Sequence, residues 1–149
     1  MKIYSRGFAE LQKEVERKLS CSTDAVIEHL AKCYLMPDHF AVNHWRQEIF
    51  GLIHRVDMLK NGEKFPSAKQ IYNWTYGKKQ DLVMDIRWLS KFVEGICEDY
   101  SIELDKSLTE FMVDFDSICT AYFQWLANGL SQTGLINKSE AYAKLHAIL

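Results

Sequence analysis

The clearest apolar stripe of the chain lies between residues 38 and 62. Its members recur at alternating spacings of three and four residues, and they are Val42, Trp45, Ile49, Leu52, Val56 and Leu59. This spacing is typical of one face of an α-helix. Pro37 prevents extension backwards, Asp38 can accept the first free backbone N–H groups, and Asn61-Gly62 suits a left-handed C-terminal turn. We therefore predict a long helix from Asp38 to Gly62, along which the other helices pack.

Two helices are predicted before this one. The first runs from about Tyr4 to Leu19, and its apolar face consists of Tyr4, Phe8, Leu11, Val15 and Leu19. The polar residues 20–23 then break the pattern. Ser22 or Thr23 can cap a second helix, which must end before Pro37.

Further helices are predicted after a loop at residues 61–66. Their expected extents are Ser67 to Tyr76, closed by Gly77, then Leu82 to Tyr100, then Ser107 to Gly129, and finally Lys138 onward, capped by Asn137. Gly51 and Gly95 fall inside helices, where glycine costs about 1 kcal/mol relative to alanine, so we expect a close helix crossing or an abutting tryptophan ring at each. No segment has the two-residue period of a strand. The sequence predicts an all-α, single-domain bundle over residues 1–149, with about six or seven helices, three of them long.

The composition agrees with one globular domain. The chain has 149 residues, of which 48% are hydrophobic and 26% charged, a balance that allows folding without a metal or a disulfide. No apolar run approaches the roughly 20 residues that cross a bilayer. Residues 1–18 alternate charged and apolar groups and do not form an apolar signal core. We expect a cytoplasmic protein that does not contact a membrane.

Candidate chemistry is sparse. No two of the cysteines have the two-residue spacing of a zinc or dithiol site, so we expect small buried hydrophobic residues at Cys21, Cys33, Cys97 and Cys119. His39, His44 and His54 are five and ten positions apart, so their rings do not converge along a helix. His44 shares a face with Glu48, which indicates a solvated contact. Phosphate loops, nucleophile elbows and HExxH motifs are absent from the sequence. We expect no enzymatic activity, no cofactor and no metal site.

A set of landmarks occurs between His29 and Tyr76. These are His29-Leu30 with Lys32, Tyr34 and Pro37, then Trp45-Arg46 with Ile49, then Pro66-Ser67 with Lys69. Their order resembles that of a bacterial all-helical domain-of-unknown-function family that is abundant in cyanobacteria. The match covers about a third of the chain, the tyrosine and the tryptophan are each displaced by one residue, the family's acidic opening segment is absent, and the chain departs from the pattern after Gly77. The resemblance implies a helical fold and no defined chemistry, because the family's own function is not established.

Two alternative binding sites are suggested by aromatic residues. One combines rings with positive charge, as in surfaces that lie on nucleic acids, and consists of Lys69, Tyr72, Tyr76, Lys78 and Lys79. Aromatic residues are mainly core material, however, so Ile71, Trp74 and one tyrosine can equally face the core. The sequence pI of about 6.2 also disfavours nucleic-acid binding. The other alternative is a helical-bundle enzyme or small-ligand carrier with a pocket lined by Trp45, Trp88 and Trp125.

Charge is distributed unevenly along the chain. Residues 46–79 contain seven Lys or Arg residues and three acids, a net of +4, whereas residues 80–120 contain ten acids and three basic residues, a net of −7. The acids crowd the junction between two predicted long helices, and we define the acidic patch as Glu94, Glu98, Asp99, Glu103, Asp105, Glu110 and Asp114. Such a patch attracts a basic partner. We expect a non-enzymatic protein-binding module, specifically a bacterial immunity protein or antitoxin that covers the active site of a basic, nuclease-like toxin.

Overall fold

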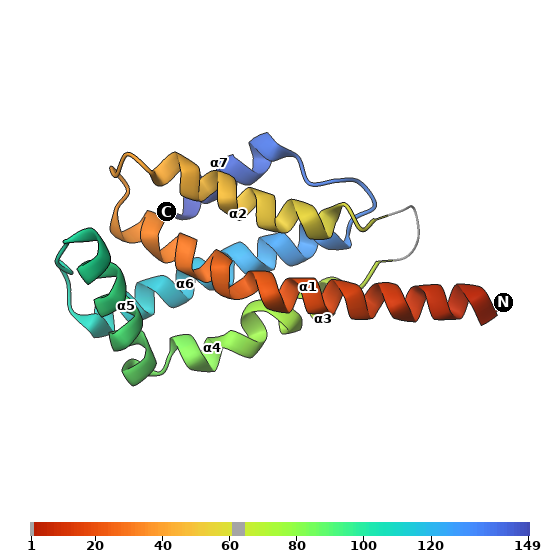
Figure 1. The fold of residues 1–149 in the computed structure, drawn as a ribbon, viewed down its shortest axis with the longest axis horizontal. Coiled ribbons are helices and arrows are strands. Elements are labelled where there is room, and N and C mark those ends of the chain that lie inside the picture. Colours follow the sequence, from red (N-terminus) through yellow and green to blue (C-terminus); the bar gives the residue numbers. More distant parts are fainter. Residues whose placement is uncertain (1, 61–64) are drawn as a thin grey trace.

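The structure is a computed structural model that describes residues 2–60 and 65–149, with side chains described except at residues 2–6 and 8. Its elements are α1 (Lys2–Leu35), α2 (Val42–Asp57), α3 (Ala68–Tyr72), a π-helical segment (Asn73–Gly77), α4 (Lys78–Val83), α5 (Ile86–Tyr100), α6 (Leu108–Ser131) and α7 (Lys138–Ile148). Regular structure in the described ranges is entirely helical, so the predicted all-α bundle is confirmed. Figure 1 shows α2 and α7 on one side of α1, α3 and α4 on the other, and α5 at the end opposite the N-terminus.

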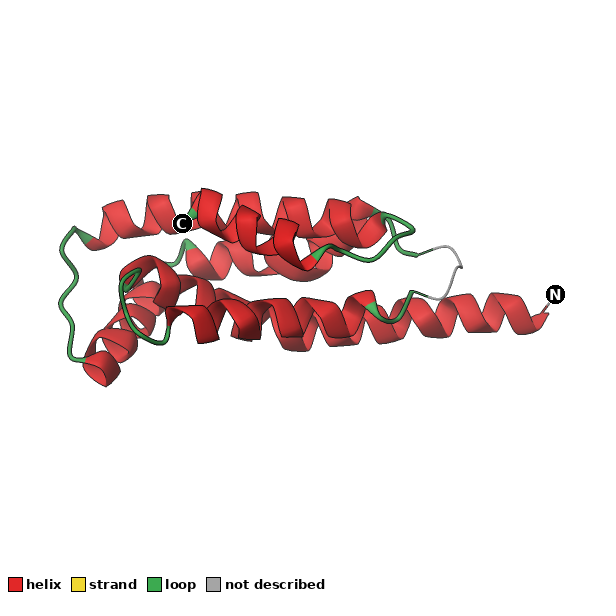
Figure 2. Cartoon of the chain, turned by 90° about the horizontal axis from the view of Figure 1, so that it is seen from above, coloured by secondary structure: helices red, strands yellow, loops and turns green. Residues whose placement is uncertain are grey.

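α1 is one continuous helix, so the predicted break at residues 20–23 is wrong. The hydroxyl of Thr23 donates a hydrogen bond to the backbone carbonyl of Leu19 at 2.6 Å, within the same helix, and does not cap a new one. Thr23 is 2% exposed and continues the buried face between Leu19 and Val26. The 34 residues of α1 span about 51 Å, which makes α1 the longest helix of the described chain. Its N-terminal turns extend past the other helices (Figure 2). The predicted stripe also includes Tyr4 and Phe8, which lie outside the described side chains.

α2 confirms the predicted stripe from Val42 to Val56, but it begins four residues later than Asp38 and ends at Asp57, so Leu59, the last member of the stripe, lies beyond the helix. Trp45, Ile49 and Val56 are buried, and Leu52 is half-buried against the core. The start is displaced because the backbone N–H of Ala41 donates to Nδ1 of His39 at 3.0 Å, while the His39 ring stacks on Trp45 with centroids 5.0 Å apart. These contacts hold the preceding residues outside the helix. The predicted turn at Asn61-Gly62 lies outside the described residues.

A buried ion pair follows the last turn of α2. The side chains of Asp57 and Lys60 are 1% and 5% exposed, and Nζ of Lys60 lies 2.7 Å from Oδ1 of Asp57 as an ion pair, not as a well-directed hydrogen bond. Oδ2 of Asp57 accepts the backbone N–H of Ile136 at 2.6 Å. Nζ of Lys60 also donates to the carbonyl oxygens of Gly129 and Gly134 at 3.1 and 2.9 Å. The pair therefore ties the end of α2 to the connection between α6 and α7.

α3 begins at the predicted cap, Ser67, whose hydroxyl accepts the backbone N–H of Gln70 at 3.3 Å. The helix does not end at Gly77 as predicted, but continues through the π-helical segment into α4. The backbone kinks at Thr75, with φ −109° and ψ −112°, and the Thr75 hydroxyl lies 3.0 Å from the carbonyl oxygens of both Ile71 and Tyr72. A Cβ atom at Gly77 would lie 3.1 Å from the carbonyl oxygen of Tyr72. Glycine therefore permits this close backbone approach.

Asp85 separates α4 from α5, a boundary that the apolar spacing does not predict. Its carboxylate accepts the backbone N–H of Arg87 at 2.9 Å and caps α5. The predicted helix from Leu82 to Tyr100 is therefore two helices. Leu82 and Ile86, at 37% and 44% exposed, do not join the buried face.

The predicted starts of the last two helices are confirmed. The hydroxyl of Ser107 accepts the backbone N–H of Glu110 at 3.1 Å at the start of α6. The side chain of Asn137 accepts the backbone N–H of Glu140, also at 3.1 Å, at the start of α7. α6 ends two residues beyond Gly129. Caps depend on residues within one helical turn, which is why the sequence alone identifies them.

Gly51 and Gly95, which lie inside α2 and α5, have open space beside them. A Cβ atom at Gly51 or at Gly95 would meet no atom within 4 Å among the described residues. Neither a close helix crossing nor a tryptophan ring abuts them, so that prediction is wrong. Gly95 instead lines a groove on the surface.

Candidate protein-binding surface

The acidic patch lies on adjoining elements at one end of the molecule. Three of its members are on α5, two are in the loop that follows, and two are in the first turns of α6 (Figure 1). All seven side chains are exposed. Of these carboxylates, Asp114 alone has an ion-pair partner within the part of the chain that the structure describes.

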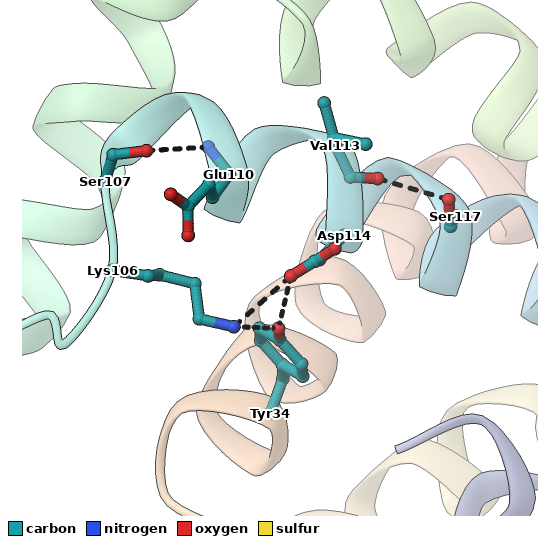
Figure 3. A network of polar contacts seen from close by, with 7 residues as sticks. All are labelled: Tyr34, Lys106, Ser107, Glu110, Val113, Asp114 and Ser117. Carbon is teal, nitrogen blue, oxygen red and sulfur yellow. Dashed lines mark hydrogen bonds and ion pairs between the residues drawn. The ribbon is translucent and has the colours of Figure 1, made fainter.

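That partner belongs to a network shown in Figure 3. The hydroxyl of Tyr34 donates to Oδ2 of Asp114 at 3.0 Å, and Nζ of Lys106 lies 2.6 Å from the Tyr34 hydroxyl and 3.2 Å from Oδ2 of Asp114. The hydrogen bond from Tyr34, followed by that from Lys106, lowers the pKa of Asp114. Hydrogen bonds to Tyr34 and to Asp114 raise the pKa of Lys106 to about 12. The network joins the last turn of α1 to the start of α6 and fixes one edge of the acidic patch.

A groove lies between α1, α4 and α5, beside the acidic patch. Its volume is about 470 Å³, and it is lined by Asp24, Ile27, Glu28, Lys79, Leu82, Val83, Trp88, Lys91, Phe92, Gly95, Ile96 and Asp99. The rings of Trp88 and Phe92 stack with centroids 4.8 Å apart. Asp99 belongs to both the groove and the acidic patch, so the two surfaces are continuous. We call them together the α5 surface.

The groove is not predicted by the sequence. Its walls come from three helices distant in sequence, and apolar spacing within one helix does not reveal a hollow between several. One feature of the sequence bears on the groove: Gly95 removes a side chain from the middle of α5, at a position that lines it.

The proposed nucleic-acid segment is divided by the fold. Tyr76 is 0% exposed, its ring stacks on Phe123 with centroids 5.7 Å apart, and its hydroxyl donates to Asp116 at 2.6 Å. A buried ring is not free to stack on a base. The other four members, Lys69, Tyr72, Lys78 and Lys79, are at least partly exposed. Lys78 pairs with Glu16 at 3.3 Å and Lys79 with Asp24 at 3.2 Å, which reduces the positive charge that this segment presents.

The three tryptophans proposed to line one pocket occupy separate places. Trp88 lines the groove. Trp45 is buried, with its ring against Tyr100 at a centroid distance of 5.6 Å, and Trp125 packs beside Tyr122 at 5.7 Å. The structure therefore does not assemble a pocket from all three.

The histidines and cysteines also lie apart. No group of three His, Cys, Asp or Glu side chains suited to hold a metal occurs among the described residues. His44 lies 3.6 Å from Glu48, and His54 stacks on Phe50. Cys33 and Cys119 are buried, as predicted, and burial raises the pKa of Cys33 to about 11. Cys97 is half-buried and Cys21 is exposed, so the prediction of a buried residue is wrong for Cys21.

Comparisons of the chain with protein-family models, with curated proteins and with solved structures found no match. The resemblance to the cyanobacterial family stays a hypothesis. Within the described ranges, no helix combines the length and the apolar character needed to cross a bilayer.

Proposed function

We propose that this protein is a non-enzymatic protein-binding module that neutralises a basic partner, as a bacterial immunity protein or antitoxin does. The observation that carries the proposal is the state of the acidic patch: six exposed carboxylates have no cationic partner among the described residues. Carboxylates arranged on a surface can occupy a groove that is built for phosphates. A basic nuclease-like toxin presents such a groove.

The position of Glu98 and Asp99 supports a binding role. Both lie in the last turn of α5, where the helix dipole disfavours negative charge, and this turn contains no basic residue. Like charges that crowd a helix C-terminus cost stability. A requirement to bind a cation explains why the chain retains them there.

The groove supplies what charge alone does not. Electrostatic attraction accelerates encounter and orients the partner, whereas buried apolar anchors supply most of the affinity. The stacked pair of Trp88 and Phe92 forms an apolar wall at which an apolar side chain of the partner can dock. Basic residues of the partner that flank this side chain would then face Asp99. The best partner is therefore a basic surface with one projecting apolar side chain.

The test uses the product of the gene adjacent to the one that encodes this protein, the usual arrangement for a toxin and its neutraliser. Association is measured at low and at high salt for the unaltered protein and for the double variant Asp99→Lys, Glu103→Lys. We expect association faster than the unsteered range of about 10⁵–10⁶ M⁻¹s⁻¹ at low salt, and a marked slowing with a flatter salt dependence in the variant.

The matched control is the double variant Lys69→Glu, Lys78→Glu, which reverses two exposed cations outside the groove. It should leave association with a basic partner almost unchanged. If the neighbouring product does not bind, or if only the lysine variant loses binding, the neutraliser proposal is refuted. In the second case a nucleic-acid-like, anionic partner takes its place.

A further inference from the structure

A second hollow lies between α2 and α7, on helices that contribute nothing to the α5 surface. Its volume is about 480 Å³, within the range of small-molecule sites. It is lined by Asn43, Arg46, Gln47, Tyr142, Ala143 and His146. The lining contains four kinds of hydrogen-bond donor, namely guanidinium, amide, phenol and imidazole groups, and no acidic residue. The protein as a whole has a net charge of −2, so this lining differs from the rest of the chain in carrying positive charge without a nearby carboxylate among its members.

Arg46 gives the hollow its permanent positive charge. Its Nε atom is buried, yet it has no hydrogen-bond partner within the described chain. Its Nη1 atom reaches Oδ1 of Asn43 only at 3.5 Å, the limit of a hydrogen bond. Burial of the Nε donor without an acceptor is unfavourable. The Nη1 atom lies at an exposed contact, and an anionic ligand that accepts a hydrogen bond there would offset this cost by pairing with the charge of the guanidinium group.

We propose that the α2–α7 hollow binds a small organic phosphate. Arginine presents a planar fork of donors that matches phosphate oxygens. A phosphate monoester has three terminal oxygens, so it can use more of the surrounding donors than a carboxylate can. The volume exceeds what a bare phosphate ion fills, which indicates an organic body. The amides of Asn43 and Gln47 suit the edge of an adenine ring, so an adenine mononucleotide is the probe of choice.

The two walls of the hollow are held in place by contacts around it. Tyr142 packs against Phe50 of α2 with ring centroids 6.0 Å apart, and Nζ of Lys138 lies within 6 Å of both ring centroids. The bond from Ile136 to the buried Asp57 fixes the connection that leads into α7. A site held by such contacts needs little ordering when a ligand binds.

The experiment is isothermal titration calorimetry of the intact protein with adenosine monophosphate, inorganic phosphate and adenosine. We expect adenosine monophosphate to bind more tightly than either fragment. Arg46→Met should weaken its binding by about ten- to a hundredfold, the effect of losing hydrogen bonds to a charged group. The matched control is Arg55→Met, which removes an exposed arginine from the same helix, outside the hollow, and should change binding less than about twofold.

Two further variants guard against a folding defect in Arg46→Met. Asn43 and His146 are exposed, so Asn43→Ala and His146→Ala should fold normally and each weaken binding severalfold. Absence of binding by adenosine monophosphate at millimolar concentration would refute the proposal. Equal binding of inorganic phosphate would refute an organic ligand, and equal binding of adenosine would refute recognition of the phosphate.

Discussion

Replacing Asp57 by alanine is expected to destabilise the protein more than removal of any exposed charge. Asp57 is 1% exposed, and its carboxylate interacts with Nζ of Lys60 and with the backbone N–H of Ile136 at 2.7 and 2.6 Å. The alanine variant leaves the ammonium group of Lys60, itself 5% exposed, without its counter-charge. Removing one member of a buried pair typically costs about 3–5 kcal/mol. Because both side chains are nearly fully buried, solvent screening does not reduce this figure much.

The measurement is urea denaturation followed by circular dichroism, with the transition midpoint and slope determined for each variant. In a thermal melt of the same variants, for a domain of this size, the expected loss corresponds to a fall in Tm of about 6–20 °C. The double variant Asp57→Ala, Lys60→Met should lose less than the sum of the two single variants, because it leaves no unpaired charge.

Glu14→Gln provides the control, since it disrupts an exposed pair with Lys18 in which the side chains are 43% and 40% exposed. This change should cost less than about 1 kcal/mol. If Asp57→Ala costs no more than the control does, the buried pair does not hold α2 to the connection before α7, and the reasoning fails.

Four other outcomes are expected. Tyr122→Phe should leave the free energy of unfolding unchanged or raise it by up to about 1 kcal/mol in urea denaturation, since the buried hydroxyl has no partner among the described residues. A fall of more than about 1 kcal/mol would contradict this, because it would show that the hydroxyl makes a stabilising hydrogen bond. Gly51→Ala should raise stability by up to about 1 kcal/mol, because a Cβ there meets open space, and a lower Tm would contradict this. Leu52→Ala should cost about 2 kcal/mol, the low end for a core leucine, because Leu52 is half-buried. Asp114→Asn should lower Tm at neutral pH, and the difference from the unaltered protein should shrink below about pH 4, because a lowered pKa stabilises the fold only where the unfolded carboxyl is ionised. A difference independent of pH would contradict the role of the Asp114 charge.

The parts of the fold that the sequence predicts are those decided within one or two helical turns. The buried stripe of α2 follows from apolar spacing, and the caps at Ser67, Ser107 and Asn137 follow from a polar side chain next to free N–H groups. Thr23 shows the limit of such reasoning. A threonine can cap a helix or bond to the carbonyl four residues before it, and the buried setting of Thr23 in the middle of α1 decides between them.

In the candidate sites too, local features could be predicted from the sequence and features built from several helices could not. The exposure of the acidic patch could be predicted, because carboxylates without partners remain hydrated. The groove and the α2–α7 hollow could not, because each depends on which helices become neighbours. The burial of Tyr76 depends likewise on Phe123, which lies far from it in sequence.

The kink at Thr75 decides the direction of α4. The backbone there leaves helical geometry, with φ −109° and ψ −112°, so the chain turns between α3 and α4 and does not continue along one axis. This turn places α4 where Lys79, Leu82 and Val83 line the groove. The shape of the groove therefore depends on one backbone bend as well as on side-chain chemistry, and a change that straightened residues 73–77 would displace one wall of the groove without altering any residue that lines it.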